Sequence, residues 1–182
     1  MKRILLGFFI IFFTCAVRAQ TKPREQVILF DHYTIPGVIQ STATASIVQD
    51  EFGLIWLGTS SGLFRFNGED FQHYPYHSDK GLLLDERQIT VLHWDNQQHR
   101  LIIGTRMAGL LQFSYQSNTI TDLYAKEETI HDIEEAADGR MWVSTPNGLF
   151  ELIDNRLIMV ADVIKSKGPV PLLSKGDSLW VG

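Results

Sequence analysis

The chain has 182 residues with a formal net charge of −5, and 45% of its residues are hydrophobic. An acidic chain without a basic run is a poor match for nucleic acid or an anionic membrane surface, and its apolar content argues against disorder. The single cysteine, Cys15, excludes an intramolecular disulfide.

The first 19 residues have the pattern of a signal peptide. Lys2 and Arg3 precede an apolar run, Ile4–Ala16, and Val17-Arg18-Ala19 predicts cleavage before Gln20. Export to the periplasm follows, and loss of three cations and no acid changes the net charge from −5 to −8. An uncleaved anchor is the alternative, although the run is shorter than the roughly 20 residues that span a bilayer. A lipoprotein site at Cys15 is disfavoured because Phe13 and Thr14 fit such a site poorly.

Residues 20–25 are polar and are predicted to be a linker, and residues 26–182 are predicted to be one folded region. A strand is expected over Gln26–Tyr33. Its end, Phe30-Asp31-His32-Tyr33, matches Phe71-Gln72-His73-Tyr74 further along the chain. We therefore expect it to be an outermost strand without its own sheet.

The next stretch predicts one four-stranded antiparallel sheet, over about residues 46–74. Asp50–Gly53, Ser60–Gly62 and Asn67-Gly68 are turn sequences, and the segments between them are apolar or alternate with period 2. Leu54–Thr59 is apolar enough for a strand buried on both faces.

This unit recurs along the chain. The segment around Trp56 returns around Ile102, Trp142 and Trp180, at spacings of 46, 40 and 38 residues. A four-stranded unit repeating at about 40–45 residues is typical of a β-propeller blade. We predict an all-β fold, a partial β-propeller with blades at about 46–74, 88–124 and 129–162, an incomplete blade from 170 and a leading outer strand. Because three blades cannot close a ring, we expect the chain to be the N-terminal part of a longer propeller.

The first blade resembles the two-component regulator propeller repeat. The resemblance is carried by Gly53, the run Ile55–Thr59, Gly62-Leu63, Arg65–Gly68 and Tyr74, and it weakens in the second blade, where Gly104-Thr105 and Gly109-Leu110 remain. The family forms periplasmic sensor regions of hybrid two-component systems in Bacteroidetes-type bacteria. The resemblance implies further blades, a membrane helix that anchors the full-length protein, and a downstream kinase.

The conspicuous side chains are better explained by the fold than by catalysis. We expect Trp56, Trp142 and Trp180 to lie in the core between blades. Thr59, Thr105 and Thr145 are expected to bond within the following turns. The six histidines show no metal-ligand spacing, and Glu127-Glu128 and Glu134-Glu135 are interpreted as solvated pairs. No catalytic residue, metal or other cofactor is predicted, and the chain is not expected to be an enzyme.

The ligand is expected at one edge of the blades. The loops after the second and fourth strands of each blade share that edge, and they include the longest and least repetitive segments. Five residues at that edge, or near the mouth of the channel, have side chains suited to polyhydroxylated or acidic ligands: His77, Asp79, Arg87, Trp94 and Arg106. For Trp94, core packing is the favoured alternative.

The sequence therefore predicts a periplasmic ligand-sensing propeller whose partners are a glycan-derived ligand and further blades. A truncated secreted propeller enzyme acting on glycans, and a propeller used only for interactions, are the alternatives. The ligand's identity, the number of blades and the oligomeric state are not encoded in any pattern of this chain.

Overall fold

A computed structural model describes residues 31–35, 43–75, 88–124, 126–162 and 168–182. The chain divides into two units, Met1–Thr34 and Ile35–Gly182. In the first unit, residues 31–34 have no regular secondary structure. The predicted strand over residues 26–33 is therefore wrong for its last three residues, which are not in a strand. Its other residues, the signal peptide and the linker lie outside the described residues.

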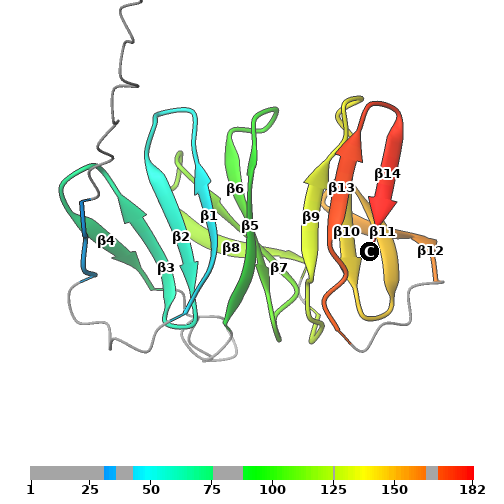
Figure 1. Cartoon of the computed structure of the whole chain (residues 1–182), viewed down its shortest axis with the longest axis horizontal. Coiled ribbons are helices and arrows are strands. Elements are labelled where there is room, and N and C mark those ends of the chain that lie inside the picture. Colours follow the sequence, from blue (N-terminus) through cyan, green and yellow to red (C-terminus); the bar gives the residue numbers. More distant parts are fainter. Residues whose placement is uncertain (1–30, 36–42, 76–87, 125, 163–167) are drawn as a thin grey trace, which may run out of the picture. The chain divides into compact units, whose positions relative to one another are not determined.

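The described part of the second unit consists of antiparallel sheets, which confirms the predicted all-β fold of four-stranded blades (Figure 1). Among the described residues there is no helix long and apolar enough to cross a membrane. The strands are β1 (Thr44–Gln49), β2 (Ile55–Thr59), β3 (Gly62–Phe66) and β4 (Phe71–Tyr74); β5 (Ile89–Asp95), β6 (Arg100–Thr105), β7 (Leu110–Ser114) and β8 (Thr119–Tyr124); β9 (Asp132–Glu135), β10 (Met141–Thr145), β11 (Gly148–Ile153) and β12 (Arg156–Ala161); and β13 (Leu172–Lys175) and β14 (Ser178–Val181).

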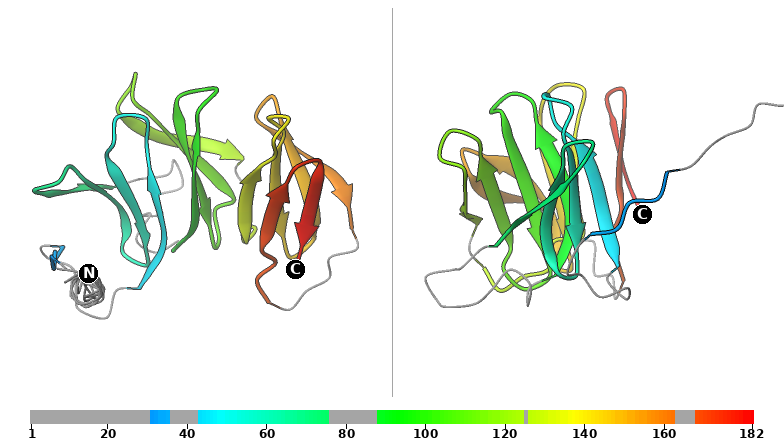
Figure 2. Two further views of the ribbon diagram at one scale, coloured as in Figure 1. Left: turned by 45° about the horizontal axis from the view of Figure 1, so that its top comes forward. Right: turned by 90° about the vertical axis from the view of Figure 1, so that its left-hand side faces the viewer.

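Each sheet is a meander in which sequence neighbours pair in order. The first three sheets have the orders β1-β2-β3-β4, β5-β6-β7-β8 and β9-β10-β11-β12, and β13 and β14 form a two-stranded sheet. Consecutive sheets contact each other through their first strands, β1 with β5, β5 with β9 and β9 with β13. The sheets therefore pack face to face in sequence order (Figure 2).

One turn of the first sheet shows how local sequence produces the hairpins. The Oδ1 atom of Asp50 accepts hydrogen bonds from the backbone N–H groups of Phe52 and Leu54, both at 2.9 Å. Its Oδ2 atom accepts a bond from the indole Nε1–H of Trp56 at 2.7 Å and another from the hydroxyl of Tyr115. Asp50 therefore closes the β1–β2 turn and ties it to the next sheet.

The core repeats because equivalent positions face the same way in every sheet. Trp56 is fully buried against the β5–β8 sheet, its ring centroid 4.8 Å from that of Phe113. Ile102 occupies the same position in the second sheet and is buried between the second and third sheets. Trp142 repeats the arrangement against the β13–β14 sheet. These positions therefore hold successive sheets together.

The fourth copy of this position departs from the prediction. Trp180 is 64% exposed, so its assignment to the core is wrong among the described residues. By the register of the repeat its side chain points away from the β9–β12 sheet, and no described element lies over that face. For the same reason Ile55 and Leu57, on the outer face of the first sheet, are only half-buried, whereas burial on both faces was predicted.

Polar side chains join the innermost strands across the sheet boundaries. The hydroxyl of Ser46 on β1 accepts the backbone N–H of Leu92 on β5 at 3.0 Å. The carboxylate of Glu134 on β9 accepts the backbone N–H of Ser174 on β13 at 2.8 Å. Glu134 is half-buried, so its interpretation as one of a solvated pair is wrong. A side chain of β1 therefore bonds the backbone of β5, and a side chain of β9 bonds the backbone of β13.

Candidate ligand-binding edge

The strand directions create two edges with different contents. The connector edge carries the turns β2–β3, β6–β7 and β10–β11 together with the described residues of the connectors between sheets. The hairpin edge carries the turns β1–β2, β5–β6, β9–β10 and β13–β14 and lies at the top of Figure 1. The predicted ligand edge is the connector edge. Of the predicted site residues, His77, Asp79 and Arg87 lie outside the described residues.

Arg106 lies on the connector edge, where the β6–β7 turn begins. Its side chain is exposed, and its Nη1 donates a 2.7 Å hydrogen bond to Oε1 of Gln88. Its backbone is held on both sides, because its N–H donates to the carbonyl of Gln88 at 3.0 Å and its carbonyl accepts from the hydroxyl of Thr129 at 2.6 Å. A charged group on a backbone fixed in this way is suited to binding an acceptor.

Trp94 lies elsewhere. It is 5% exposed and packs in the core between the first two sheets, and its strand partner is Leu101, close to the hairpin edge. Arg106 follows the opposite end of the same sheet. The structure therefore does not bring Trp94 and Arg106 together, and the burial of Trp94 agrees with the packing role that was favoured for it. Its role in ligand binding stays a prediction.

Glu128 is a buried carboxylate on this edge that the sequence reasoning missed. It is 6% exposed, and its Oε1 accepts hydrogen bonds from the Thr145 hydroxyl at 2.9 Å and the Asn147 side-chain amide at 2.7 Å. Its interpretation as one of a solvated pair is wrong, because these partners come from the β10–β11 turn of the same sheet. The Thr145 hydroxyl also accepts the backbone N–H of Asn147 at 3.0 Å, so Thr59, Thr105 and Thr145 all bond within the following turns as predicted.

The second oxygen of Glu128 is less well satisfied. Oε2 is buried without a hydrogen-bond partner, and Nζ of Lys126 lies 3.7 Å from it. The pKa of Lys126 is raised, first by its hydrogen bond with Tyr124 and then by the charge of Glu128. Burial of a carboxylate with a free oxygen is costly unless another donor approaches. Among the described residues, Lys126 is therefore the one charged neighbour of this oxygen, which keeps hydrogen-bonding capacity.

Arg106 and Glu128 belong to one continuous network. The carbonyl of Glu128 accepts the backbone N–H of Gly109, and the neighbouring residue Thr129 bonds the carbonyl of Arg106. The edge thus presents the cation of Arg106, the carboxylate of Glu128 and the amide of Asn147 on a hydrogen-bonded backbone. Together these groups form a hydrogen-bonding surface. Over the described residues no group of histidine, cysteine and acidic side chains is arranged to hold a metal ion. The burial of Glu128 could have been predicted from the sequence. Glu128 lies two residues before the apolar Ile130, on a connector too short to move away from the sheet.

Comparisons with known proteins support the fold. No family model matches the sequence, and no curated protein matches it either. Two similar solved structures are extracellular domains of proposed hybrid two-component systems of B. thetaiotaomicron. The domain of BT3049 has a TM-score of 0.59 and 21% identity over 84% of this chain. The domain of BT4673 has a TM-score of 0.59 and 19% identity over 76%.

A second structure of the BT4673 domain, described there as part of a proposed one-component system, has a TM-score of 0.58. The matched region is 20–21% of the length of these structures, so the chain spans about a fifth of them. Identities at this level establish the fold alone. The described sheets therefore share the fold of these extracellular domains.

Proposed function

We propose that this chain is part of the periplasmic ligand-sensing region of a two-component signalling receptor, and that it is a binding module without catalytic activity. The supporting observation is a series of packed sheets with the fold of the extracellular domains of two proposed hybrid two-component systems. Over the described residues, the connector edge carries a fixed polar network rather than a paired nucleophile and base. The signal-peptide pattern of residues 1–19 supports export.

The ligand that fits this edge best is a fragment of a glycan. Arg106 offers donors, Glu128 has an oxygen with hydrogen-bonding capacity beside Lys126, and Asn147 adds an amide that bonds to Glu128. Hydroxyl groups both donate and accept, so a sugar can bond to all three kinds of group. His77, Asp79 and Arg87 are proposed to complete this site, and the rest of the receptor's propeller is the proposed protein partner.

Glycan-array binding by the purified exported chain, followed by calorimetry on the oligosaccharides retained, tests this function. We expect Arg106→Ala to weaken binding by about tenfold or more, which corresponds to about 1.4 kcal/mol. Changing Arg87 together with Arg106 should weaken it further. Arg156→Ala is the matched control, because Arg156 is an exposed arginine at the start of β12, away from this edge. Equal affinities of the Arg106 and Arg156 variants would remove Arg106 from the site, and breakdown of the bound glycan would contradict a purely binding role.

A further inference from the structure

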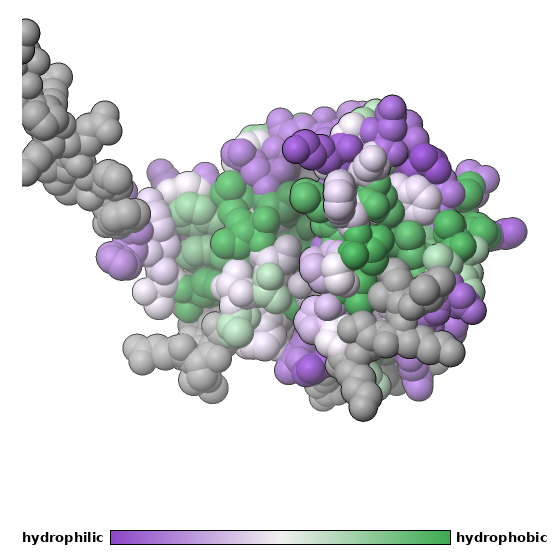
Figure 3. Space-filling model, turned by 45° about the vertical axis from the view of Figure 1, so that its right-hand side comes forward, coloured by the Kyte–Doolittle hydropathy of each residue, from purple (hydrophilic) through white to green (hydrophobic). Residues whose placement is uncertain are grey.

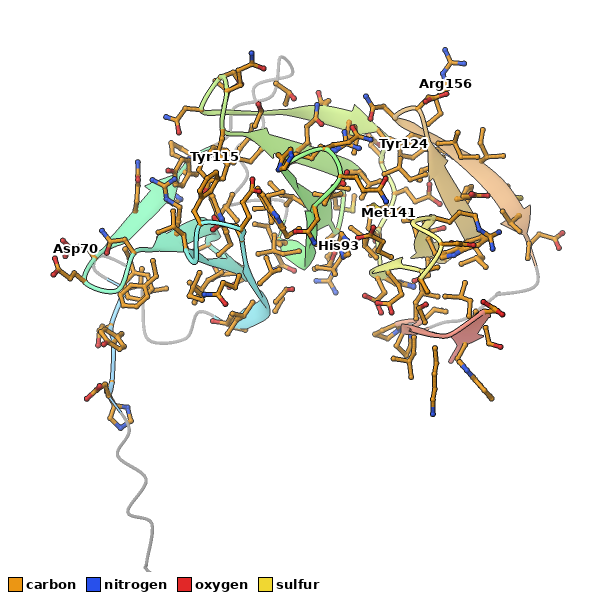
Figure 4. All side chains as sticks on the ribbon, turned by 90° about the horizontal axis from the view of Figure 1, so that it is seen from above. Asp70, His93, Tyr115, Tyr124, Met141 and Arg156 are labelled. Atoms are coloured by element: carbon orange, nitrogen blue, oxygen red, sulfur yellow. The ribbon has the colours of Figure 1, made fainter. Side chains whose placement is uncertain are left out.

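The hairpin edge contains a polar hollow between the second and third sheets. Its volume is about 60 Å³. It lies where the β5–β6 and β9–β10 turns face each other, and Figure 4, which looks onto this edge, shows His93 and Met141 on the two sides of the boundary. The hollow is lined by Asp95, Gln97, Gln98, Arg100, Glu135, Gly139, Met141 and Leu152.

A buried arginine forms part of this hollow. Arg100 is 7% exposed, and its Nε donates to Oδ2 of Asp95 at 3.0 Å. Its Nη1 donates to Oε1 of Gln112 at 2.7 Å and to Oδ1 of Asn155 at 2.8 Å. These bonds go to β5, to β7 and to the β11–β12 turn, and they fix the plane of the guanidinium group. No hydrogen bond to a described residue is made by Nη2.

The other walls leave further hydrogen-bonding capacity. Gln97 is engaged, because its side-chain amide donates to Oε1 of Glu135 at 3.1 Å and so joins the two turns. Oε2 of Glu135 has only the distant Nε2 of His93, at 3.6 Å. The exposed side chain of Gln98 bonds to no described residue. The hollow therefore combines a fixed cation, an acceptor and an amide.

The mixture of charges restricts what can bind. An anion would meet the carboxylates of Asp95 and Glu135, a metal cation would meet Arg100, and an apolar group would leave the polar walls unsatisfied. A neutral group that both donates and accepts matches every wall. A volume of about 60 Å³ has room for a few water molecules or for the hydroxyl-bearing edge of one sugar ring.

We propose that this hollow is a binding subsite for adjacent hydroxyl groups of a saccharide. It is separate from the connector edge, and it rests on the proposed function in taking the ligand to be saccharide-derived. Arg100 donates to one hydroxyl oxygen, Glu135 accepts from a hydroxyl, and Gln98 closes the mouth. Because the walls come from two sheets, an occupied hollow ties the β5–β6 turn to the β9–β10 turn.

Nuclear magnetic resonance of the isotope-labelled full chain tests the subsite. The probes are methyl α-D-glucopyranoside and myo-inositol, and tetrahydropyran, a sugar-sized ring without hydroxyl groups, is the control ligand. We expect saturable shifts of the Gln98 side-chain amide and the Arg100 Nε–H signals with Kd of about 1–10 mM for at least one hydroxylated probe. Tetrahydropyran should not shift them.

Matched variants identify the residues responsible. Gln98→Ala should raise the Kd at least about fivefold, whereas Gln116→Ala, which removes an exposed glutamine from the β7–β8 turn, should leave it unchanged. The proposal is overturned if both hydroxylated probes leave the Gln98 and Arg100 signals unchanged up to about 100 mM, or if tetrahydropyran shifts them equally. Shifts confined to Arg106 and Asn147 would also overturn it, while supporting the proposed function at the connector edge.

Discussion

At the scale of the residue, two tryptophans at the same position of the repeat have opposite environments. Trp56 is fully buried and hydrogen-bonded to Asp50, whereas Trp180 is 64% exposed. We expect Trp56→Ala to lower the free energy of unfolding by about 3–5 kcal/mol, because a large aromatic side chain is lost from a packed core. Trp180→Ala should change it by less than about 0.5 kcal/mol. Urea denaturation followed by circular dichroism compares the two variants, and similar losses would contradict this assignment of the core.

A second residue makes stability depend on alkaline pH. Burial, and then the hydrogen bond to Asp50, raise the pKa of Tyr115 from 10.0 to about 12. The unfolded chain loses this proton near pH 10, whereas the folded chain retains it up to about pH 12. The contribution of Tyr115 to stability is therefore complete below pH 10 and is lost as the pH rises through this window.

The measurement is the urea midpoint of unfolding between pH 9 and pH 12 for the natural chain and for Tyr115→Phe. We expect the variant to start from a lower midpoint, because it lacks the bond to Asp50, and to lose less with rising pH. The raised pKa of Tyr74 remains in both proteins. Parallel curves would show that Tyr115 does not carry the pH dependence.

At the scale of the element, the distance between sheets is set by small residues in the second strand. A Cβ atom on Gly104 would lie 2.5 Å from Cγ1 of Val91 and 2.9 Å from Cγ2 of Ile130. Ser144 has a side chain at the equivalent position of β10, and its hydroxyl donates to the carbonyl of Val170 at 2.6 Å. A side chain at this position of the second strand therefore fits only if the connector packed against it leaves space or offers a hydrogen-bond partner.

Gly104→Ala should lower the free energy of unfolding by about 1–3 kcal/mol, because Val91 on β5 and Ile130 before β9 must move to admit the methyl group. Gly168→Ala is the control, since an added Cβ there meets nothing within 4 Å. Thermal denaturation of both variants checks the prediction. A neutral Gly104→Ala would mean that the sheets are not closely packed at this position.

At the scale of the whole molecule, the described surface includes a large apolar area. Leu173 and Trp180 are opposite each other on β13 and β14 and are 60% and 64% exposed. Ile158, Met159 and Val160 on β12 are each about half exposed. Figure 3 shows hydrophobic surface on the side of the molecule that carries these strands. An exposed apolar patch of this kind promotes association.

We expect the purified chain to associate more as its concentration rises, and the double change Leu173→Glu and Trp180→Lys to reduce this association without lowering the melting temperature. Lys175→Glu changes the charge of the same hairpin but leaves the apolar patch, so it is the matched control. Light scattering over a concentration series measures the effect. If the double variant associates as strongly as the control, this patch is not the cause.

The sequence by itself determined the turns, the repeat and the strands within the described sheets. Asp50, Gly53 and the alternation around Trp56 act over a few residues, so their consequences can be predicted from local spacing. The reliable predictions were therefore the four-stranded antiparallel units and the burial of Trp56 and Trp142.

Only the tertiary structure decided which polar side chains are buried and which meet. Glu128 is buried by partners almost twenty residues away, and Arg100 bonds to Asn155, 55 residues away. Trp94 and Arg106 looked like members of one site but lie toward opposite ends of one sheet, and Trp180 repeats the sequence of Trp56 without its cover. In each case the outcome depends on how one sheet packs against another, or on which strands and turns meet within a sheet. The hydrophobic period and the strand propensity of a segment do not encode those contacts.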